Sequence, residues 1–101
     1  MVKEKLVRDR IPELIEASGE EPVVRKANQQ ELEKFLLEKI VEEAIEFRET
    51  GDIDELVDIL EVLDAFMDYR KIDSGLIEIQ QHAKRLARGG FKEGFVLETD
   101  D

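Results

Sequence analysis

The stretch KIVEEAIEFRETGDIDELVDILEVLDAFMDY, residues 39–69, decides the fold of this chain. Two helical patterns meet in it at a short turn, Gly51-Asp52. When each pattern is wound at about 100° per residue, apolar side chains fall on a broad arc and most acidic side chains fall opposite it. We therefore predict two helices, over about residues 29–49 and 53–70, which the turn folds back against each other.

Four carboxylates break this pattern. Glu43 and Glu46 project within the apolar arc of the first helix, and the i, i+3 spacing places them on one face. Glu55 and Asp58 do the same in the second helix. Burying an ionised carboxylate is costly unless it is paired or binds a metal. Four converging oxygen ligands, without cysteine or a neighbouring histidine, favour Mg²⁺ or Mn²⁺ over zinc.

The two acidic motifs resemble those of a known superfamily. EEAIE (residues 42–46) followed by ELVD (residues 55–58) resembles the ExxE and ExxD motif of the all-α nucleoside triphosphate pyrophosphohydrolases. That superfamily includes the MazG proteins, the dimeric dUTPases and phosphoribosyl-ATP pyrophosphohydrolase. KLVRDRIPELIEASG (residues 5–19) and KRLARGGF (residues 84–91) resemble its small MazG-like branch of predicted house-cleaning pyrophosphatases.

The resemblance implies a reaction. A nucleoside triphosphate would be hydrolysed between its α and β phosphates, with Mg²⁺ (or Mn²⁺) held by the four inward carboxylates. Either Glu43 or Glu46 would act as general base, and the sequence does not decide between them. The apolar arcs of the central helices are too broad for one chain to cover, so we also predict a homodimer whose hairpins form a shared four-helix bundle.

Basic residues are candidates for binding the substrate phosphates. Lys84 and Arg88 are near the end of a predicted helix, where cations also favour the helix dipole without any further role. Arg8 and Arg10, in the run VRDRIP, either line the site or pair with the acidic helices. His82 has no carboxylate partner at helical spacing in the motif and is expected at the surface.

The connection between the two motifs departs from the superfamily. Only eight residues separate Glu46 from Glu55, which is shorter than in most members and leaves the base preference open. A second ExxD, Glu61 to Asp64, would give a more usual separation. We reject it because its two side chains point to the charged side of the helix.

Length and composition set limits on the remaining possibilities. The 101 residues are expected to form a single domain, and the net charge of −11 disfavours nonspecific binding to nucleic acid or anionic membranes. There is no cysteine, no signal peptide and no long apolar run, so we expect a cytoplasmic protein.

The flanking segments complete an all-α, four-helix chain. We predict a first helix from Pro12 to about Ala17 and a fourth from about Gly75 to Arg88, capped by Ser74. Residues 20–26 and 91–98 are expected to be extended and could pair as a short ribbon.

Two other functions remain open. One is phosphoribosyl-ATP hydrolysis in histidine synthesis. The other is a non-enzymatic acidic helical module that binds a basic partner, in which Arg8, Arg10 or Lys39 would neutralise the inward carboxylates. Independently of these functions, Glu55 could be no more than the capping-box glutamate of its helix.

Overall fold

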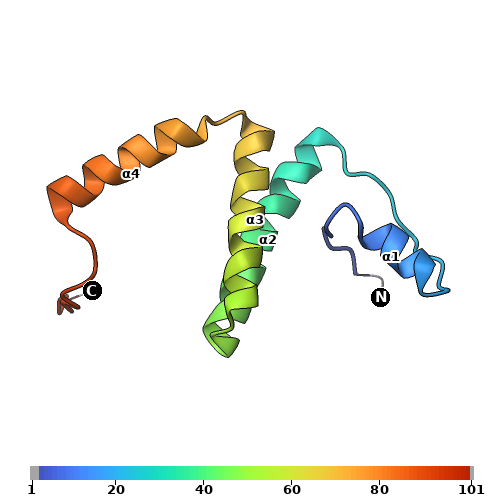
Figure 1. The fold of residues 1–101 in the computed structure, drawn as a ribbon, viewed down its shortest axis with the longest axis horizontal. Helices are drawn as coiled ribbons and strands as arrows, with labels where there is room; N and C mark the ends of the chain where they lie inside the picture. Colours follow the sequence, from blue (N-terminus) through green and yellow to red (C-terminus); the bar gives the residue numbers. More distant parts are fainter. Residues whose placement is uncertain (1–2, 101) are drawn as a thin grey trace. The chain divides into compact units, whose positions relative to one another are not determined.

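A computed structural model describes residues 3–100, within which four α-helices form. They are α1 (Ile11–Ala17), α2 (Gln29–Thr50), α3 (Ile53–Arg70) and α4 (Ser74–Arg88), shown in Figure 1. No strand forms in this described range, so the all-α prediction is confirmed. The segments 20–26 and 91–98 are irregular, and neither contributes to a β-ribbon.

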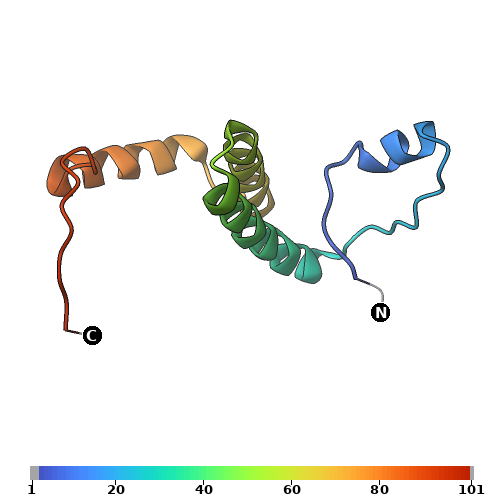
Figure 2. The ribbon, with the colours of Figure 1, turned by 90° about the horizontal axis from the view of Figure 1, so that it is seen from below.

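The chain divides into two compact units, residues 1–70 and 71–101. In the first unit α2 and α3 pack along each other as a helical hairpin, visible in Figures 1 and 2. The N-terminal segment and α1 complete this unit, and α4 with the segment after it forms the second. That the whole chain is a single domain stays a prediction.

Helix α2 begins at Gln29, as the sequence predicts, and ends at Thr50, one residue after the predicted end. The Asn28 side chain accepts a hydrogen bond from the Glu31 backbone N–H, and the Glu31 carboxylate accepts one from the Asn28 N–H, each at 2.9 Å. This is a capping box, which satisfies two free donors of the first turn. At the other end Gly51 adopts a left-handed conformation with φ of 68°, which glycine tolerates best.

The fourth helix starts one residue earlier than predicted. Asp73, and not Ser74, is the capping residue, because its carboxylate accepts a hydrogen bond from the Gly75 N–H at 2.8 Å. Aspartate and serine are about equally good caps, and the sequence places them next to each other. The correction moves no predicted site residue.

The end of the hairpin opposite the Gly51 turn is fastened by polar contacts. The Tyr69 hydroxyl donates a hydrogen bond to the Gln29 carbonyl at 2.8 Å. The Arg70 guanidinium pairs with Glu33 at 2.7 Å and also lies 5.4 Å from the centre of the Phe66 ring. Tyr69 and Phe66 are therefore engaged in holding the hairpin together.

The inner face of the hairpin is covered, and a second apolar stripe is not. Leu36 of α2 is buried, with 4% of its surface exposed. Other large apolar side chains of both helices are 38–58% exposed: Leu37, Val41, Ile45, Leu56, Val57, Leu60 and Leu63. A contiguous exposed apolar stripe is typical of a surface that another molecule covers.

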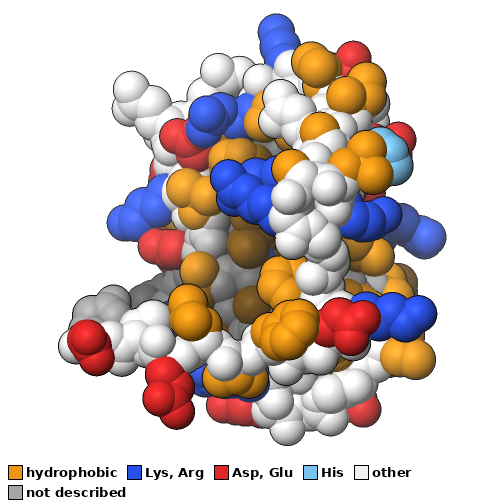
Figure 3. All heavy atoms as spheres, turned by 90° about the vertical axis from the view of Figure 1, so that its left-hand side faces the viewer, with side chains coloured by type: hydrophobic (Ala, Val, Ile, Leu, Met, Phe, Trp, Pro, Cys, Tyr) orange, Lys and Arg blue, Asp and Glu red, His pale blue; other side chains and the backbone are white. Residues whose placement is uncertain are grey.

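The second unit exposes both apolar and basic side chains. Figure 3 shows hydrophobic side chains beside lysine and arginine side chains on the face that carries α4. Along the segment after α4, Phe91, Phe95 and Val96 are almost fully exposed. None of the helices within residues 3–100 is long and apolar enough to cross a membrane.

Candidate metal centre

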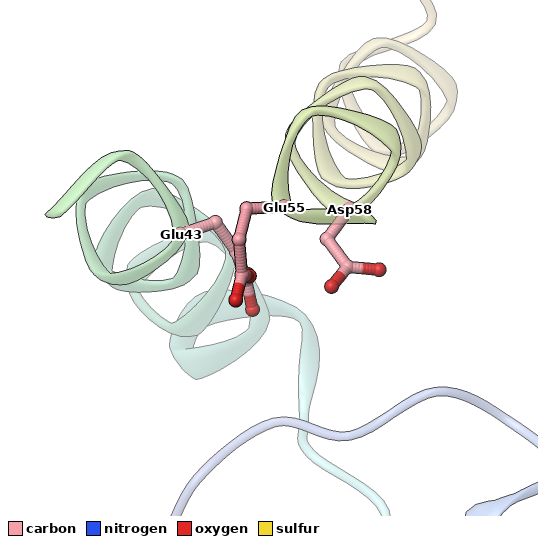
Figure 4. Close-up of side chains that lie close together, drawn as sticks. All are labelled: Glu43, Glu55 and Asp58. Carbon is pink, nitrogen blue, oxygen red and sulfur yellow. The ribbon is translucent and has the colours of Figure 1, made fainter. Parts of the chain in front are cut away.

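Three carboxylates converge on the side of the hairpin. Glu43 comes from α2, and Glu55 and Asp58 come from successive turns of α3. One oxygen of each lies within 4.8 Å of the others, and Figure 4 shows all three side chains pointing into the same space. The phase argument from the sequence therefore brings together three of its four predicted ligands.

Glu43 is the buried member of this cluster. It has 6% of its surface exposed, and its Oε1 lies 3.4 Å from the Lys39 ammonium. Its Oε2 is buried and has no hydrogen-bond partner within residues 3–100. Because buried polar atoms are nearly always satisfied, this oxygen calls for a hydrogen-bond donor or a cation in the space that it faces.

Glu55 is at the centre of the acidic charge. Desolvation, reinforced by repulsion from and hydrogen bonding to Glu46 and Glu43, raises its pKa to about 7. Glu46 therefore lies near enough to perturb Glu55, although it is not one of the three carboxylates that converge. A shared proton relieves the crowding at neutral pH, and a divalent cation would relieve it more completely.

Asp58 already has a cationic partner. An Arg8 guanidinium nitrogen lies 2.5 Å from its Oδ1, so a residue of the N-terminal segment reaches the cluster from 50 positions away. Both side chains are partly exposed, at 53% for Arg8 and 37% for Asp58. The site is thus open to solvent on the Asp58 side and closed on the Glu43 side.

The cluster fits a hard divalent cation. Its donors are carboxylate oxygens, which Mg²⁺ and Mn²⁺ prefer. Within residues 3–100, the ion pairs of these carboxylates with basic groups are those of Arg8 with Asp58 and of Lys39 with Glu43, while Glu46 adds a fourth carboxylate beside Glu55. The buried oxygen of Glu43 supplies an independent sign that positive charge belongs there.

The other predicted binding residues are distributed differently. Arg10, the residue directly before α1, pairs with Glu13 in the first turn of that helix at 2.6 Å. Lys84 and Arg88 are exposed on α4 in the second unit, as is His82. The substrate-binding roles of Lys84, Arg88, Arg8 and Arg10 stay predictions. Glu61 and Asp64 are both exposed, in agreement with the phase argument against the second ExxD.

A cavity that no sequence pattern indicates adjoins the cluster. Residues 3–6 and the α2 side chains Phe35, Glu38, Lys39 and Glu42 line a space of about 450 Å³. Lys39 also contacts Glu43, so the cavity and the carboxylates share a side chain. Its wall depends on how the N-terminal segment lies against α2, which no local sequence pattern encodes.

That segment is held in place by a second charged group. Arg25 binds Glu4 at 2.9 Å and Glu31 at 2.6 Å, which joins the N-terminal segment to the start of α2. Hydrogen bonding and charge attraction lower the pKa of both carboxyl groups and raise that of Arg25. The members of this group are scattered over three segments, so no local sequence pattern reveals it.

Comparison with known proteins gives one partial relative. An uncharacterized protein from Mycolicibacterium smegmatis is 52% identical over 44 residues, which make up 44% of this chain and 45% of that protein. This chain thus spans less than half the length of its relative. No protein-family model and no solved structure matches the chain. The comparisons therefore supply no activity, substrate or partner.

Proposed function

We propose that the chain is a Mg²⁺-dependent nucleoside triphosphate pyrophosphohydrolase, which releases a nucleoside monophosphate and pyrophosphate. The observation that carries the proposal is the convergence of Glu43, Glu55 and Asp58 around a buried carboxylate oxygen without a partner. The resemblance of the two acidic motifs to the MazG-like superfamily supports the reaction class. A role in removing non-standard nucleotides is part of the same proposal.

The carboxylates have distinct tasks in this reaction. Glu43, Glu55 and Asp58 would hold the ion, with Glu46 at its edge. A bound Mg²⁺ would neutralise phosphate charge and favour ionisation of water. Glu46 or Glu43 would accept the proton of the attacking water as general base. The water oxygen bonds to phosphorus, the bridging P–O bond breaks, and pyrophosphate leaves.

The substrate has room beside the cluster. The cavity of about 450 Å³ lies against Lys39, and pockets of this size accommodate small ligands. Arg8 stands next to Asp58 and would reach the phosphates, since arginine binds phosphate oxygens through two parallel donors. Arg10, Lys84 and Arg88 are further candidates for phosphate contacts.

A homodimer belongs to the proposal. The exposed apolar stripe on α2 and α3 would be covered if the hairpins of two copies packed face to face as a four-helix bundle. A cytoplasmic location agrees with the absence of cysteine from the sequence.

The decisive experiment measures pyrophosphate release. Standard and modified nucleoside triphosphates, together with phosphoribosyl-ATP, are incubated with the protein and Mg²⁺ or Mn²⁺, with and without chelator. We expect chelator-sensitive release from at least one of them, and the ranking identifies the preferred base. A preference for phosphoribosyl-ATP would assign the protein to histidine synthesis and not to the removal of non-standard nucleotides. No release from any substrate would contradict the proposal.

One observation favours a non-enzymatic alternative. Arg8 pairs with Asp58 and Lys39 with Glu43, which are pairings expected if the inward acids are only neutralised by the chain's own cations. The protein would then be an acidic helical module for a basic partner. Divalent cations would not raise its melting temperature, whereas a metal-binding enzyme would be stabilised.

A further inference from the structure

Arg8 stands beside a predicted metal ligand. Its guanidinium lies 2.5 Å from Asp58 Oδ1, and Asp58 is one of the three converging carboxylates. A carboxylate oxygen that accepts a hydrogen bond from the Arg8 guanidinium at this distance is less available to a divalent cation. Two cations on one carboxylate group would also repel each other, so occupation of the site requires the pair to loosen.

The N-terminal segment can release Asp58 without leaving the hairpin. It is fastened at two charged points: Arg8 to Asp58, and Glu4 to Arg25. Arg25 is bound in turn to Glu31 near the start of α2. The second fastening shares no residue with the carboxylate cluster. Arg8 itself is half-exposed and precedes a turn in which its carbonyl accepts a hydrogen bond from the Ile11 N–H.

We propose that Arg8 is the resident counter-ion of the site, which Asp58 exchanges for a divalent cation. The released guanidinium then binds the polyphosphate of the incoming substrate. The second half rests on the proposed function. When the pair separates, the cation replaces Arg8 as the partner of Asp58, and the polyphosphate replaces Asp58 as the partner of Arg8. The site should therefore bind a cation and a polyphosphate together more tightly than either one alone.

The exchange predicts effects of opposite sign for one substitution. In Arg8→Gln the competitor is gone, so the affinity for Mn²⁺ alone should rise about fivefold or more. The affinity of the Mn²⁺-loaded protein for inorganic tripolyphosphate should fall by a similar factor, because the phosphate partner is gone as well. Calorimetric titration of the full chain with MnCl₂, and then with tripolyphosphate, measures both.

A matched control is available on α3. Arg70 is as exposed as Arg8, at 52% against 53%, and pairs with Glu33 at 2.7 Å. It lies twelve residues after Asp58, or about 18 Å along the helix, which is beyond the screening length at physiological salt. Arg70→Gln removes the same charge and should leave both affinities within about twofold of the unmodified protein. Arg8→Lys keeps the charge and should bind Mn²⁺ more weakly than Arg8→Gln.

The results separate the exchange from the proposed function. An unchanged or lowered Mn²⁺ affinity in Arg8→Gln, with Arg70→Gln unchanged, would overturn the exchange and make Arg8 a structural residue. An equal rise in both variants would mean a general charge effect and would also overturn it. If the unmodified protein binds no Mn²⁺, the metal site fails and the exchange fails with it. If Arg8→Gln binds Mn²⁺ more tightly but the unmodified protein hydrolyses no nucleotide, the exchange of Arg8 for a cation is supported and only the proposed enzymatic activity is refuted.

Discussion

Two arginine–carboxylate pairs join α3 to another segment of the first unit, and they look almost the same. Arg8 binds Asp58 at 2.5 Å and Arg70 binds Glu33 at 2.7 Å, with nearly equal exposure of the arginines and 37% exposure of both acids. The difference is in what surrounds the acid. Asp58 has Glu43 and Glu55 within 4.8 Å, whereas Glu33 belongs to no such cluster among the described residues.

The comparison teaches that an ion pair does not reveal its role by its own geometry. The Arg70–Glu33 pair joins the two helices at the end of the hairpin opposite the turn, and its one positive and one negative charge balance each other. The Arg8–Asp58 pair leaves a buried Glu43 oxygen unsatisfied and Glu55 with a raised pKa. Structural pairs balance their charges locally, while an excess of carboxylates is typical of a site that binds a cation.

The largest expected difference is in catalysis. Asp58→Asn removes a predicted metal ligand and should lower kcat about 100-fold or more. Glu33→Gln changes an equally exposed acid in the other pair and should leave activity within about twofold, since it lies outside the cluster. Steady-state pyrophosphate release measures both.

Glu43→Gln tests the same point from the buried side of the cluster and should also abolish turnover in a folded protein. Circular dichroism verifies folding of each variant. Retained activity in Glu43→Gln or Asp58→Asn would refute the assignment of the site.

Metal-dependent stability should separate the pairs next. At a Mg²⁺ concentration of about 100 times Kd, a ligand that binds only the folded state adds about 2.7 kcal/mol to the free energy of unfolding. We expect the melting temperature of the unmodified protein and of Glu33→Gln to rise with Mg²⁺, and that of Asp58→Asn to stay nearly constant. A similar rise in all three proteins would show that the ion binds elsewhere.

The pH dependence of the metal-free protein should reveal Glu55. Its pKa is about 7 in the folded protein against a usual 4.5, so between these values the folded state holds more protons than the unfolded chain. The free energy of unfolding therefore falls as pH rises through this window and levels off above it. Urea unfolding at pH 5.5 and 7.5 with chelator should show this decrease, and Glu55→Gln should weaken it.

The Arg25 group titrates outside that window. The pKa values of Glu4 and Glu31 are lowered, so their contribution to stability is lost only as pH falls below about 4.5. An equal decrease between pH 5.5 and 7.5 in Glu55→Gln and the unmodified protein would assign the effect to another residue.

The smallest effect concerns the structural pair itself. Arg70→Gln breaks an exposed ion pair, and such pairs contribute about 0–1 kcal/mol to the free energy of unfolding. We expect a loss within this range and no change in Mg²⁺ affinity. A loss well above about 1 kcal/mol would mean that the contact of Arg70 with the Phe66 ring also contributes to the free energy of unfolding.

The helices could be predicted because their signals are local. Asn28 and Glu31 are residues of the types and spacing that form a capping box. Gly51 is the only glycine between the two central helical patterns, so it predicts where the first of them ends. The inward acids could be predicted for a related reason. Helical phase alone places Glu43 and Asp58 among apolar neighbours, and the turn then brings the two helices together.

Arg8, Arg10 and Lys39 could be named as candidate partners of the carboxylates, but which of the two arginines reaches them could not be predicted in this way. Arg8 and Arg10 are two residues apart and equally basic, yet Arg8 reaches Asp58 and Arg10 pairs with Glu13. The choice depends on the path of the N-terminal segment before α1, which long-range contacts such as Glu4–Arg25 determine. Glu46 illustrates the same limit, since its helical phase predicts a ligand, whereas the converging group is Glu43, Glu55 and Asp58 and Glu46 only neighbours Glu55.

The fastenings of the hairpin have a consequence for ion selection. The Gly51 turn joins α2 and α3 at one end, and the Tyr69 and Arg70 contacts join them at the other. The carboxylates lie between these two connections, so the helices are held together on both sides of the site. Changes in ligand spacing must then come from side-chain rotation and not from spreading of the helices. Mg²⁺ binds oxygen ligands at about 2.0–2.1 Å, whereas Ca²⁺ binds more oxygens at about 2.3–2.6 Å. A site whose helices cannot move apart therefore favours the smaller ion, Mg²⁺.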